Sequence, residues 1–228
     1  MTYAISDIHG EYELFIRLLD KIGFSQRDTL YICGDVIEKG PQSLRLARFV
    51  SQMPNVKCIA GNHEYAFLKY YYGQAGQFSV GSEQLLNKLK AYFSEDRELL
   101  DWELLDWFEQ LPFYIEENDF ICVHAGAPMD REGRVLPIEN ARPEELVYDR
   151  NFKDPKVIPT ESKCVFFGHT PSCYLTGGKS KILTYLREGK SGGTISDYCK
   201  IHLDVGTWIT GTVGAFCLET CEPIYARK

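Results

Sequence analysis

The chain has 228 residues, of which 44% are hydrophobic and 25% are charged, a composition that is ordinary for a globular protein. This length is enough for one large domain, or at most two small ones, with a full core. The formal net charge of −7 argues against binding to the phosphate backbone of nucleic acids. It does not exclude a small anionic substrate, because a few cations or bound metal ions can dominate the field of a cleft.

The sequence contains no segment typical of membrane insertion or export. Its longest apolar stretches have only the length of a strand, so we expect no membrane partner. A basic segment followed by an apolar one is missing near Met1, and on that ground we expect a cytoplasmic protein. The eight cysteines include no CxxC pair, and four of them lie inside apolar strand runs. We therefore expect neither a zinc knuckle nor disulfides.

The first third of the chain repeats a strand, a loop and a helix. We predict strands at 2–5, 29–32 and 56–59. The helices that follow them are predicted at 11–22, 42–52 and 64–72. Parallel βαβ units of this kind bring the carboxyl ends of their strands to one edge of a sheet, where α/β proteins bind ligands.

The rest of the chain predicts a helical segment and then further strands. Residues 82–110 contain two amphipathic helices, 83–93 and 97–111, which we expect to form a cap beside the site, with Trp102 and Trp107 as packing residues. Strands are predicted at 113–116, 119–123, 164–167 and near 200–204, 212–218 and 222–225. The stretch 172–196, rich in Gly, Ser and Lys, is expected to be a hairpin or a flap. No second domain boundary is visible, so we expect a single domain over 1–228.

Five short polar motifs each follow one of the apolar strand runs. They are Asp7-Ile8-His9-Gly10, Gly34-Asp35, Gly61-Asn62-His63-Glu64, Val123-His124-Ala125-Gly126 and Gly168-His169-Thr170. Together they offer carboxylates, an amide oxygen and imidazoles, which suit Mn²⁺, Fe²⁺ or Zn²⁺. One such motif alone is more often a turn, but five in order after strands indicate a metal site.

The residue types suggest how two ions could share this site. Asp7 and His9 lie on the same side of an extended segment and can bind one ion together. Asp35 is the natural bridging ligand because a carboxylate has two oxygens, and Asn62 adds a neutral oxygen. The second ion would be completed by His124 and His169. Two ions at an open site activate water and hold phosphoryl oxygens for in-line attack.

These motifs, together with Gly-Asp-Val-Ile-Glu-Lys-Gly and Phe-Gly-His-Thr-Pro, resemble the signature set of the calcineurin-like metallophosphoesterases. More narrowly, they resemble the phosphoprotein phosphatase branch, which includes small bacterial and bacteriophage serine/threonine phosphatases and symmetrical diadenosine tetraphosphate hydrolases. The resemblance runs from Tyr3 to about Phe216. It implies an α/β fold, a four-layer α/β/β/α sandwich with two mixed sheets and a dimetal site at the sheet edges.

The resemblance also implies roles for particular residues. Asp7, His9 and Asp35 would bind one ion, and Asp35, Asn62, His124 and His169 the other. His63 would be the general acid, a role that suits an imidazole. Arg150 falls where this branch has a phosphate-binding arginine. Asp204 would lie near the site as a supporting group, whereas His202 is less expected as a ligand.

One motif departs from the family pattern. Its usual Asp-Arg pair is replaced by Glu38 and Lys39. Glu38 can still orient His63, with one more methylene of slack. Lys39 keeps the positive charge of arginine but lacks the planar guanidinium group, which can bind a phosphate through two parallel hydrogen bonds. The property that this replacement affects most is therefore the substrate class.

The sequence therefore predicts a phosphatase that uses two divalent metal ions, with Mn²⁺ as the first choice and Fe, Zn or Ni as alternatives. Phosphoserine or phosphothreonine on a protein is the first expected substrate. The alternative is a nucleotide or a diadenosine polyphosphate, which would make the partner a phosphorylated small molecule. A third reading is a phosphate-binding module that has lost turnover, suggested only by Glu38 and Lys39. The oligomeric state stays open.

Overall fold

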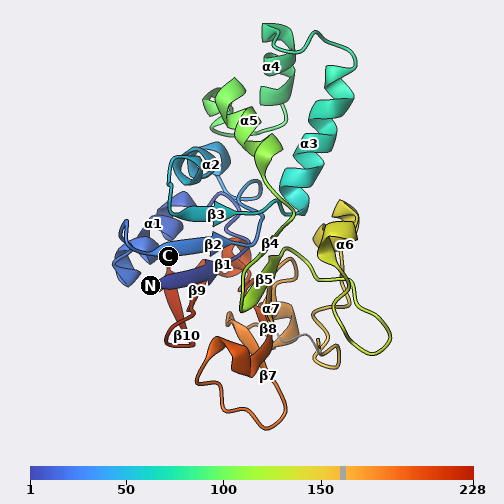
Figure 1. Cartoon of the computed structure of the whole chain (residues 1–228). Helices are drawn as coiled ribbons and strands as arrows, with labels where there is room; N and C mark the ends of the chain where they lie inside the picture. The colour runs from blue at the N-terminus through green and yellow to red at the C-terminus, as the bar shows by residue number, and fades with distance from the viewer. Residues whose placement is uncertain (160–162) are drawn as a thin grey trace.

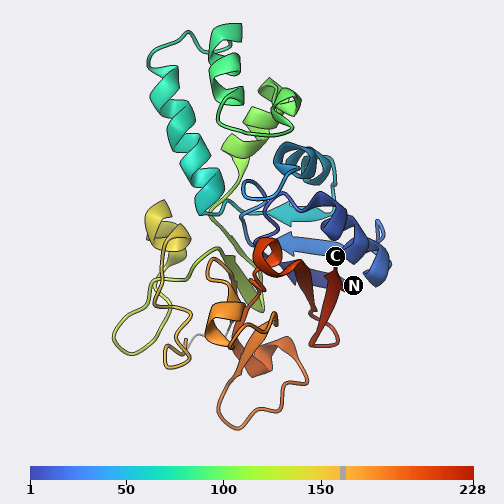
Figure 2. The same ribbon diagram turned by 180° about the vertical axis from the view of Figure 1, so that it is seen from behind.

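Across residues 1–159 and 163–228, which the computed structural model describes, the strands form two five-stranded mixed sheets (Figures 1 and 2). The strand order is β10-β9-β1-β2-β3 in the first sheet and β4-β5-β6-β8-β7 in the second. Helices cover the first sheet, and a short helix with long loops covers the second. The predicted α/β fold with two mixed sheets is confirmed.

The first sheet is built from the two ends of the chain. Its parallel strands are β1 (Thr2–Ile5), β2 (Thr29–Ile32) and β3 (Val56–Cys58), and its antiparallel strands are β9 (Thr212–Cys217) and β10 (Glu222–Arg227). Ile5 lies opposite Ile32, so β1 and β2 end side by side. The loops that follow both strands therefore leave the sheet at the same edge.

The second sheet comes from the second half of the chain. Its strands are β4 (Tyr114–Glu116), β5 (Phe120–Val123), β6 (Cys164–Phe167), β7 (Leu183–Leu186) and β8 (Tyr198–His202). The three central strands β5, β6 and β8 are parallel. The strand predicted near 200–204 ends two residues early, which places Asp204 in the loop that follows β8.

Alternating side chains divide the interior into three layers. On β1, Ala4 points between the sheets, whereas Tyr3 and Ile5 pack against α1 (Tyr12–Ile22) and α2 (Ser43–Ser51). On β6, Phe166 points between the sheets and Phe167 packs under α6 (Pro143–Val147). Both faces of each sheet are therefore buried, which explains the continuous apolar runs in the sequence.

The cap consists of α3 (Asn62–Ala75), α4 (Glu83–Lys90), a 3₁₀ turn η1 (Arg97–Leu99) and α5 (Trp102–Gln110), which project together in Figure 1. Two predicted boundaries are wrong. Asn62 and His63 belong to the first turn of α3, and the helix predicted at 97–111 is broken before α5. The break occurs because the Asp101 side chain accepts a hydrogen bond from the backbone N–H of Leu104 at 2.9 Å and starts a new helix. Trp102 and Trp107 pack against the core, as expected.

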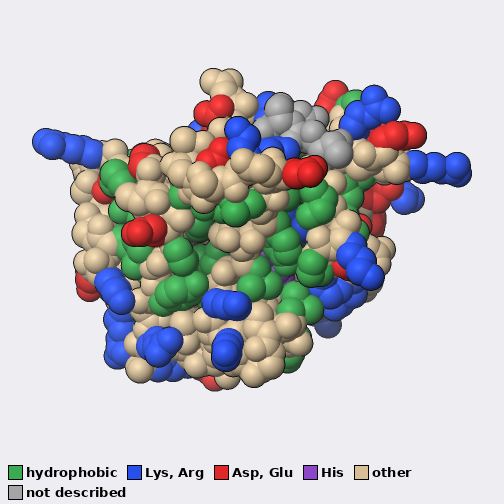
Figure 3. Space-filling view, turned by 90° about the horizontal axis from the view of Figure 1, so that it is seen from below, with side chains coloured by type: hydrophobic (Ala, Val, Ile, Leu, Met, Phe, Trp, Pro, Cys, Tyr) green, Lys and Arg blue, Asp and Glu red, His purple; other side chains and the backbone are tan. Residues whose placement is uncertain are grey.

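Short elements complete the second half of the chain. They are η2 (Ile138–Asn140), α7 (Ser172–Leu175), η3 (Ile195–Asp197) and α8 (Thr207–Thr210). Within the stretch 172–196, β7 pairs antiparallel with β8 and forms the edge of the second sheet. Seen from the end opposite the cap, apolar side chains gather in the middle of the surface (Figure 3). No helix in the described part of the chain has the length and apolar character needed to cross a membrane.

Candidate metal centre

The polar motifs meet where strands of both sheets end. Backbone hydrogen bonds join the loops after β1 and β2, from Asp7 N–H to Gly34 O at 3.1 Å and from His9 N–H to Asp35 O at 2.9 Å. A further bond, from Gly168 N–H to His124 O at 2.7 Å, joins the loops after β5 and β6. The structure thus places residues from both halves of the chain around one centre.

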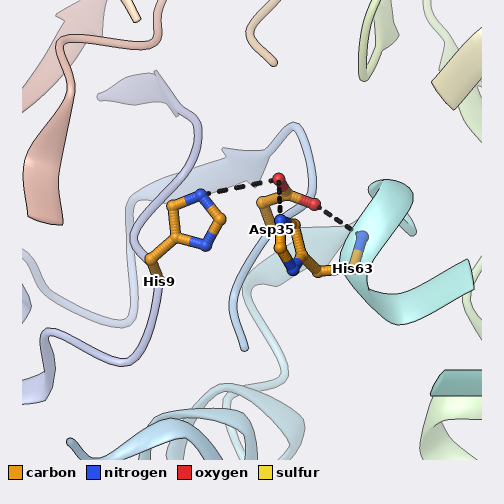
Figure 4. A group of neighbouring side chains, drawn as sticks. All are labelled: His9, Asp35 and His63. Atoms are coloured by element: carbon orange, nitrogen blue, oxygen red, sulfur yellow. Dashed lines mark hydrogen bonds and ion pairs between the residues drawn. The ribbon is translucent and has the colours of Figure 1, made fainter. Parts of the chain in front are cut away.

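Three side chains from the first sheet's loops form one candidate metal-binding group. His9, Asp35 and His63 point toward one another (Figure 4), and each offers a donor atom within 4.8 Å of the others. Asp35 Oδ2 lies 3.6 Å from His9 Nε2 and 3.8 Å from His63 Nε2. Asp7 Oδ1 is nearby, 3.8 Å from His9 Nε2.

A second candidate group connects the two sheets. It consists of Asp7, Asp35 and His124, again within 4.8 Å of one another. His124 Nε2 lies 3.5 Å from Asp35 Oδ2 and 3.0 Å from Asn62 Oδ1. The ring of His169 joins through its Nδ1, 2.7 Å from the same Asn62 oxygen. Asp35 therefore belongs to both groups, the position expected of a bridging ligand.

The imidazoles are prepared to act as neutral ligands. The Nδ1 atoms of His9 and His124 donate to the carbonyl oxygens of Ile37 and Cys33, at 3.1 and 2.8 Å, which leaves each Nε2 lone pair facing the carboxylates. Burial, with help from nearby positive charge, lowers the pKa of His9 to about 3. Burial likewise lowers the pKa of His169 to about 3. Metal ligands must be deprotonated, so these rings suit a cation.

Two of the buried carboxylates near the centre have raised pKa values, and a third has a lowered one. Burial and the negative charge of Asp7 raise the pKa of Asp35 well above its usual range, and the same two causes raise the pKa of Asp204. For Asp7, burial is outweighed by His124, His9 and a hydrogen bond from Ser6, which together lower its pKa. Crowded buried carboxylates of this kind are stabilised by cations. His169 Nε2 is also buried without a partner among the described residues, so the donor set fits divalent metal ions.

Backbone conformation is specialised around the centre. The left-handed region, with φ between 51° and 70°, is occupied by several non-glycine residues: Asp7, His9, Asp35, Glu38, Lys39 and His169. Each such residue costs about 1–2 kcal/mol. Glycine is required at two other points, because a Cβ atom on Gly61 would lie 2.2 Å from Asp35 Oδ1 and one on Gly168 would lie 2.1 Å from Asp7 Oδ2. Strain and close approach are both concentrated at the site.

Glu64 fixes the loop that holds Asp35. It is fully buried, and its carboxylate accepts hydrogen bonds from the backbone N–H groups of Asp35 at 2.9 Å, Val36 at 2.8 Å, Ile37 at 3.1 Å and Gly61 at 2.8 Å. Glu64 belongs to the Gly61-Asn62-His63-Glu64 motif, but no role was predicted for it from the sequence. A glutamate at the third helical position, which often reaches back to the N-cap, was the available signal.

His63 is oriented by Glu38. The His63 Nδ1 atom hydrogen-bonds the Glu38 carboxylate, which leaves Nε2 facing Asp35. Tyr92, on the cap, lines the same groove as Glu38, and burial together with the Glu38 carboxylate raises the pKa of its hydroxyl. Although burial opposes it, Glu38 and Asp35 together raise the pKa of His63. The helix at 83–93 was predicted to form a cap beside the site, but no role was predicted for Tyr92 within it.

The other predicted residues lie around the centre. Lys39 Nζ is 2.9 Å from His9 Nε2 and 5.3 Å from the ring centroid of Trp208, a residue that the sequence analysis did not single out. Arg150 is exposed on the loop after α6, and its charge contributes to the lowered pKa of His169. Asp204 is buried and accepts a hydrogen bond from Gly206 N–H at 2.8 Å.

His202 is not part of either candidate group. Its ring stacks on Phe167, with centroids 4.6 Å apart, and is fully buried. A residue that lies closer to the ligands is Tyr148, whose ring meets His169 edge-on at 6.5 Å. The lower expectation for His202 as a ligand agrees with this geometry.

Comparison with known proteins places this geometry in a family. The model of the calcineurin-like phosphoesterases matches residues 2–190. A symmetrical bis(5'-nucleosyl)-tetraphosphatase of Vibrio parahaemolyticus is 32% identical over 127 residues, which cover 55% of this chain and 44% of that protein. The asymmetrical bis(5'-nucleosyl)-tetraphosphatase PrpE of Bacillus velezensis is 30% identical over 149 residues, covering 59% and 60%. The chain thus spans about half the length of the curated relatives it matches.

Solved structures share the fold. One, provisionally described as a diadenosine tetraphosphatase, superimposes with a TM-score of 0.71 at 19% identity, covering 99% of this chain and 92% of the other. A metallophosphoesterase from Sphaerobacter thermophilus gives a TM-score of 0.58 at 16% identity, covering 100% and 87%. With the family match over most of the chain, the protein belongs to the calcineurin-like phosphoesterases, and its described residues include candidate ligands for a dinuclear metal site.

Proposed function

We propose that this protein hydrolyses dinucleoside polyphosphates or related nucleotides with two divalent metal ions. The observation that carries the proposal is the position of Asp35, which belongs to both candidate groups and lies beside His63. The sequence relatives support the substrate class, because they are named bis(5'-nucleosyl)-tetraphosphatases. Phosphoserine or phosphothreonine on a protein, the first expectation from the sequence, has no comparable support.

We assign the metal ligands as the sequence suggests. One ion would bind Asp7, His9 and Asp35, and the other would bind Asp35, Asn62, His124 and His169. Mn²⁺ is our first choice, and Fe, Zn or Ni suit the same oxygen and imidazole donors. We leave His63 out of the ligand set, although its ring lies in the first group, because Glu38 holds its Nδ1 atom and Nε2 is left to donate a proton.

The surrounding residues define the proposed reaction. Two bound ions would supply an activated water molecule and neutralise the phosphoryl oxygens. The oxygen of that water forms a bond to phosphorus while the P–O bond to the leaving group breaks. His63 donates its Nε2 proton to the departing oxygen, and Glu38 holds the ring in place. Asp204 supports the ligands from a buried position nearby.

Lys39 and Arg150 would bind the phosphates of the substrate. The ammonium group of Lys39 is a point charge on a flexible stem, so it cannot grip one phosphoryl group with two parallel hydrogen bonds. A polyphosphate chain offers oxygen acceptors at several distances, and a flexible cation can bind it without that fork. The replacement of the family's arginine is therefore compatible with the nucleotide alternative.

A substrate panel tests the proposal. Metal-depleted protein reloaded with Mn²⁺ is assayed against diadenosine tetraphosphate and a phosphoserine peptide, with products separated by chromatography. We expect preference for the dinucleotide, and a loss of about two orders of magnitude or more in the variant Asp35→Asn. The exposed Asp119→Asn serves as the matched control. Preference for the phosphopeptide would contradict the nucleotide proposal, and metal-independent activity would contradict the role of Asp35.

One observation favours a second candidate, a phosphate-binding module without turnover. Lys39 Nζ lies within hydrogen-bonding distance of His9 Nε2, the atom that would face an ion. Such a module would bind inorganic phosphate but release none from any substrate in the panel. Turnover by the wild-type protein that is lost in Asp35→Asn excludes this reading.

A further inference from the structure

A groove of about 450 Å³ lies beside the proposed general acid. One wall is the turn from Glu38 to Ser43, and the other is the segment from Tyr92 to Asp96 at the end of the cap. Glu38 belongs to this groove and also binds the Nδ1 atom of His63, so the groove extends to the residue that holds the proposed general acid. Its volume is in the range of small-molecule sites.

The charges of the groove determine which chemical groups can bind in it. Glu38, Glu95 and Asp96 place carboxylates along it, whereas the ammonium group of Lys39 lies next to His9 at one end. A second phosphate in the groove would be repelled by these carboxylates. A neutral group with N–H donors would be favoured, and the amino groups of a nucleobase are of that kind.

Asp96 is fixed at the wall of the groove. Its Oδ2 atom accepts a hydrogen bond from Arg45 N–H at 2.9 Å, and its Oδ1 atom is buried away from solvent. The carboxylate of Glu95 is exposed, so it is the acceptor in the groove that a ligand can reach.

The aromatic wall is rigid and connected to the catalytic centre. Phe93 is buried, and both Tyr92 and Phe93 pack on Phe67, with ring centroids 5.2 and 5.0 Å apart. Tyr92 and Glu38 line the same groove. An aromatic surface suits a flat heterocycle, and a ligand against this wall would lie next to the carboxylate that orients His63.

We propose that the groove between the 38–43 turn and residues 92–96 is a subsite for the nucleoside of the leaving group. The inference rests on the proposed function and deepens it. As the bond between phosphorus and the bridging oxygen breaks, that oxygen leaves with the proton from His63 as part of a nucleotide whose base occupies the groove. Carboxylates accept hydrogen bonds from the base, and the phosphates stay near Lys39.

The test blocks the groove without touching the ligands. Ser94 is exposed and lines the groove, so Ser94→Phe would fill it, whereas Ser79→Phe places the same side chain elsewhere on the cap. The readout is the ratio of kcat/KM for diadenosine tetraphosphate to kcat/KM for inorganic tripolyphosphate, which carries no nucleoside. We expect Ser94→Phe to lower this ratio about tenfold or more and Ser79→Phe to leave it unchanged. The ratio is insensitive to the fraction of folded protein.

A direct binding measurement tests the subsite independently of the proposed hydrolysis. Adenosine, which has no phosphate, is titrated into the Mn²⁺-loaded protein and followed by ligand-observed NMR. Binding that is lost in Ser94→Phe and kept in Ser79→Phe supports the subsite even if no dinucleotide is hydrolysed, in which case only the proposed activity fails. Absence of adenosine binding to the wild-type protein, or an unchanged kinetic ratio in Ser94→Phe, overturns the subsite.

Discussion

The position of Asp35 is closely constrained by its neighbours, by its burial and by its backbone conformation. Its Oδ2 atom lies between 3.5 and 3.8 Å from the Nε2 atoms of His9, His63 and His124, and its Oδ1 atom accepts a hydrogen bond from His63 N–H at 3.0 Å. The side chain is almost fully buried, and its backbone is left-handed. A carboxylate held in this way by two loops is preorganised to bridge two cations.

The role of His63 can be tested through the leaving group. A phosphoanhydride releases a weakly basic phosphate that needs little protonation, whereas an alkyl phosphate releases a strongly basic alkoxide. We therefore expect His63→Asn to cost about 10²–10⁴-fold in kcat for an alkyl phosphate and much less for diadenosine tetraphosphate. Steady-state kinetics on both substrates, with metal content measured alongside, provide the comparison. Equal losses on the two substrates would rule out proton donation by His63.

Glu64 offers a test of positioning. Glu64→Gln replaces one acceptor oxygen by an N–H₂ group, which faces backbone N–H donors that have no other acceptor in the described part of the chain. We expect a loss of about 3 kcal/mol or more in the free energy of unfolding, together with weaker metal binding. Urea denaturation measures the first effect and calorimetric titration with Mn²⁺ the second. The exposed Glu188→Gln is the control, and equal stability of the two variants would contradict this role.

Sequence identified the candidate ligands but missed three residues around them, Glu64, Tyr92 and Trp208. The ligands sit directly after apolar strand runs, so local pattern was enough to find them. Tyr92 and Trp208 reach Glu38 and Lys39 only because the cap and α8 fold back over the loop after β2. No local sequence pattern predicts that Tyr92 and Trp208 lie near these residues, because the residues beside them in the sequence predict ordinary packing.

Among the elements, β8 carries an unusual buried cation. Lys200 is fully buried, and its Nζ atom donates to the carbonyl oxygens of Phe152 at 2.6 Å and Asp154 at 2.8 Å. Its ammonium group also lies 4.7 Å from the ring centroid of Tyr185. This lysine fastens the loop that follows Arg150 to the second sheet, and it forms no salt bridge with a carboxylate among the described residues.

The lowered pKa of Lys200 predicts how the free energy of unfolding depends on pH. Burial lowers its pKa from 10.5 to about 8 in the folded protein, so between those values the unfolded chain binds more protons. The free energy of unfolding of the wild type, relative to that of Lys200→Met, should therefore rise as the pH increases from about 8 to 10.5. Urea denaturation across this range measures the difference. Lys179→Met, at an exposed position, is the control, and a difference that is flat or falls with pH would contradict the prediction.

Some boundaries of helices could not be predicted from local sequence. Apart from β7, for which no bounds were predicted, the strands were predicted to within two residues because most of their apolar runs are buried. The start of α3 was missed, since Gly-Asn normally signals a turn, and here Glu64 stabilises Asn62 and His63 in the first helical turn. The break before α5 was missed although Asp101 is a good N-cap, because the apolar spacing continues across it.

At the scale of the whole molecule, the candidate centre lies between the two sheets. Asp7 and Asp35 come from the first sheet, and His124 and His169 come from the second. An ion shared by these residues would connect the two halves of the fold. The packing between the sheets positions the ligands, and the ions would in turn hold the sheets together.

Metal binding should therefore stabilise the whole fold. An ion that binds only the folded chain contributes about 2.7 kcal/mol at a free concentration a hundredfold above its Kd. We expect the midpoint of thermal unfolding to rise with added Mn²⁺ and to fall after chelation. Differential scanning calorimetry measures the shift, and Asp35→Asn should remove most of it. A midpoint that does not respond to Mn²⁺ in the wild type would contradict a metal site between the sheets.

The left-handed backbone at Asp7, His9 and Asp35 has an evolutionary consequence. Glycine or asparagine would adopt these conformations more easily and would also relieve the crowding of buried charge. Mutations that destroy the centre can therefore make the folded chain more stable rather than less. In a lineage no longer selected for hydrolysis, activity would be lost early and the fold late, leaving stable descendants whose shape still resembles that of an enzyme.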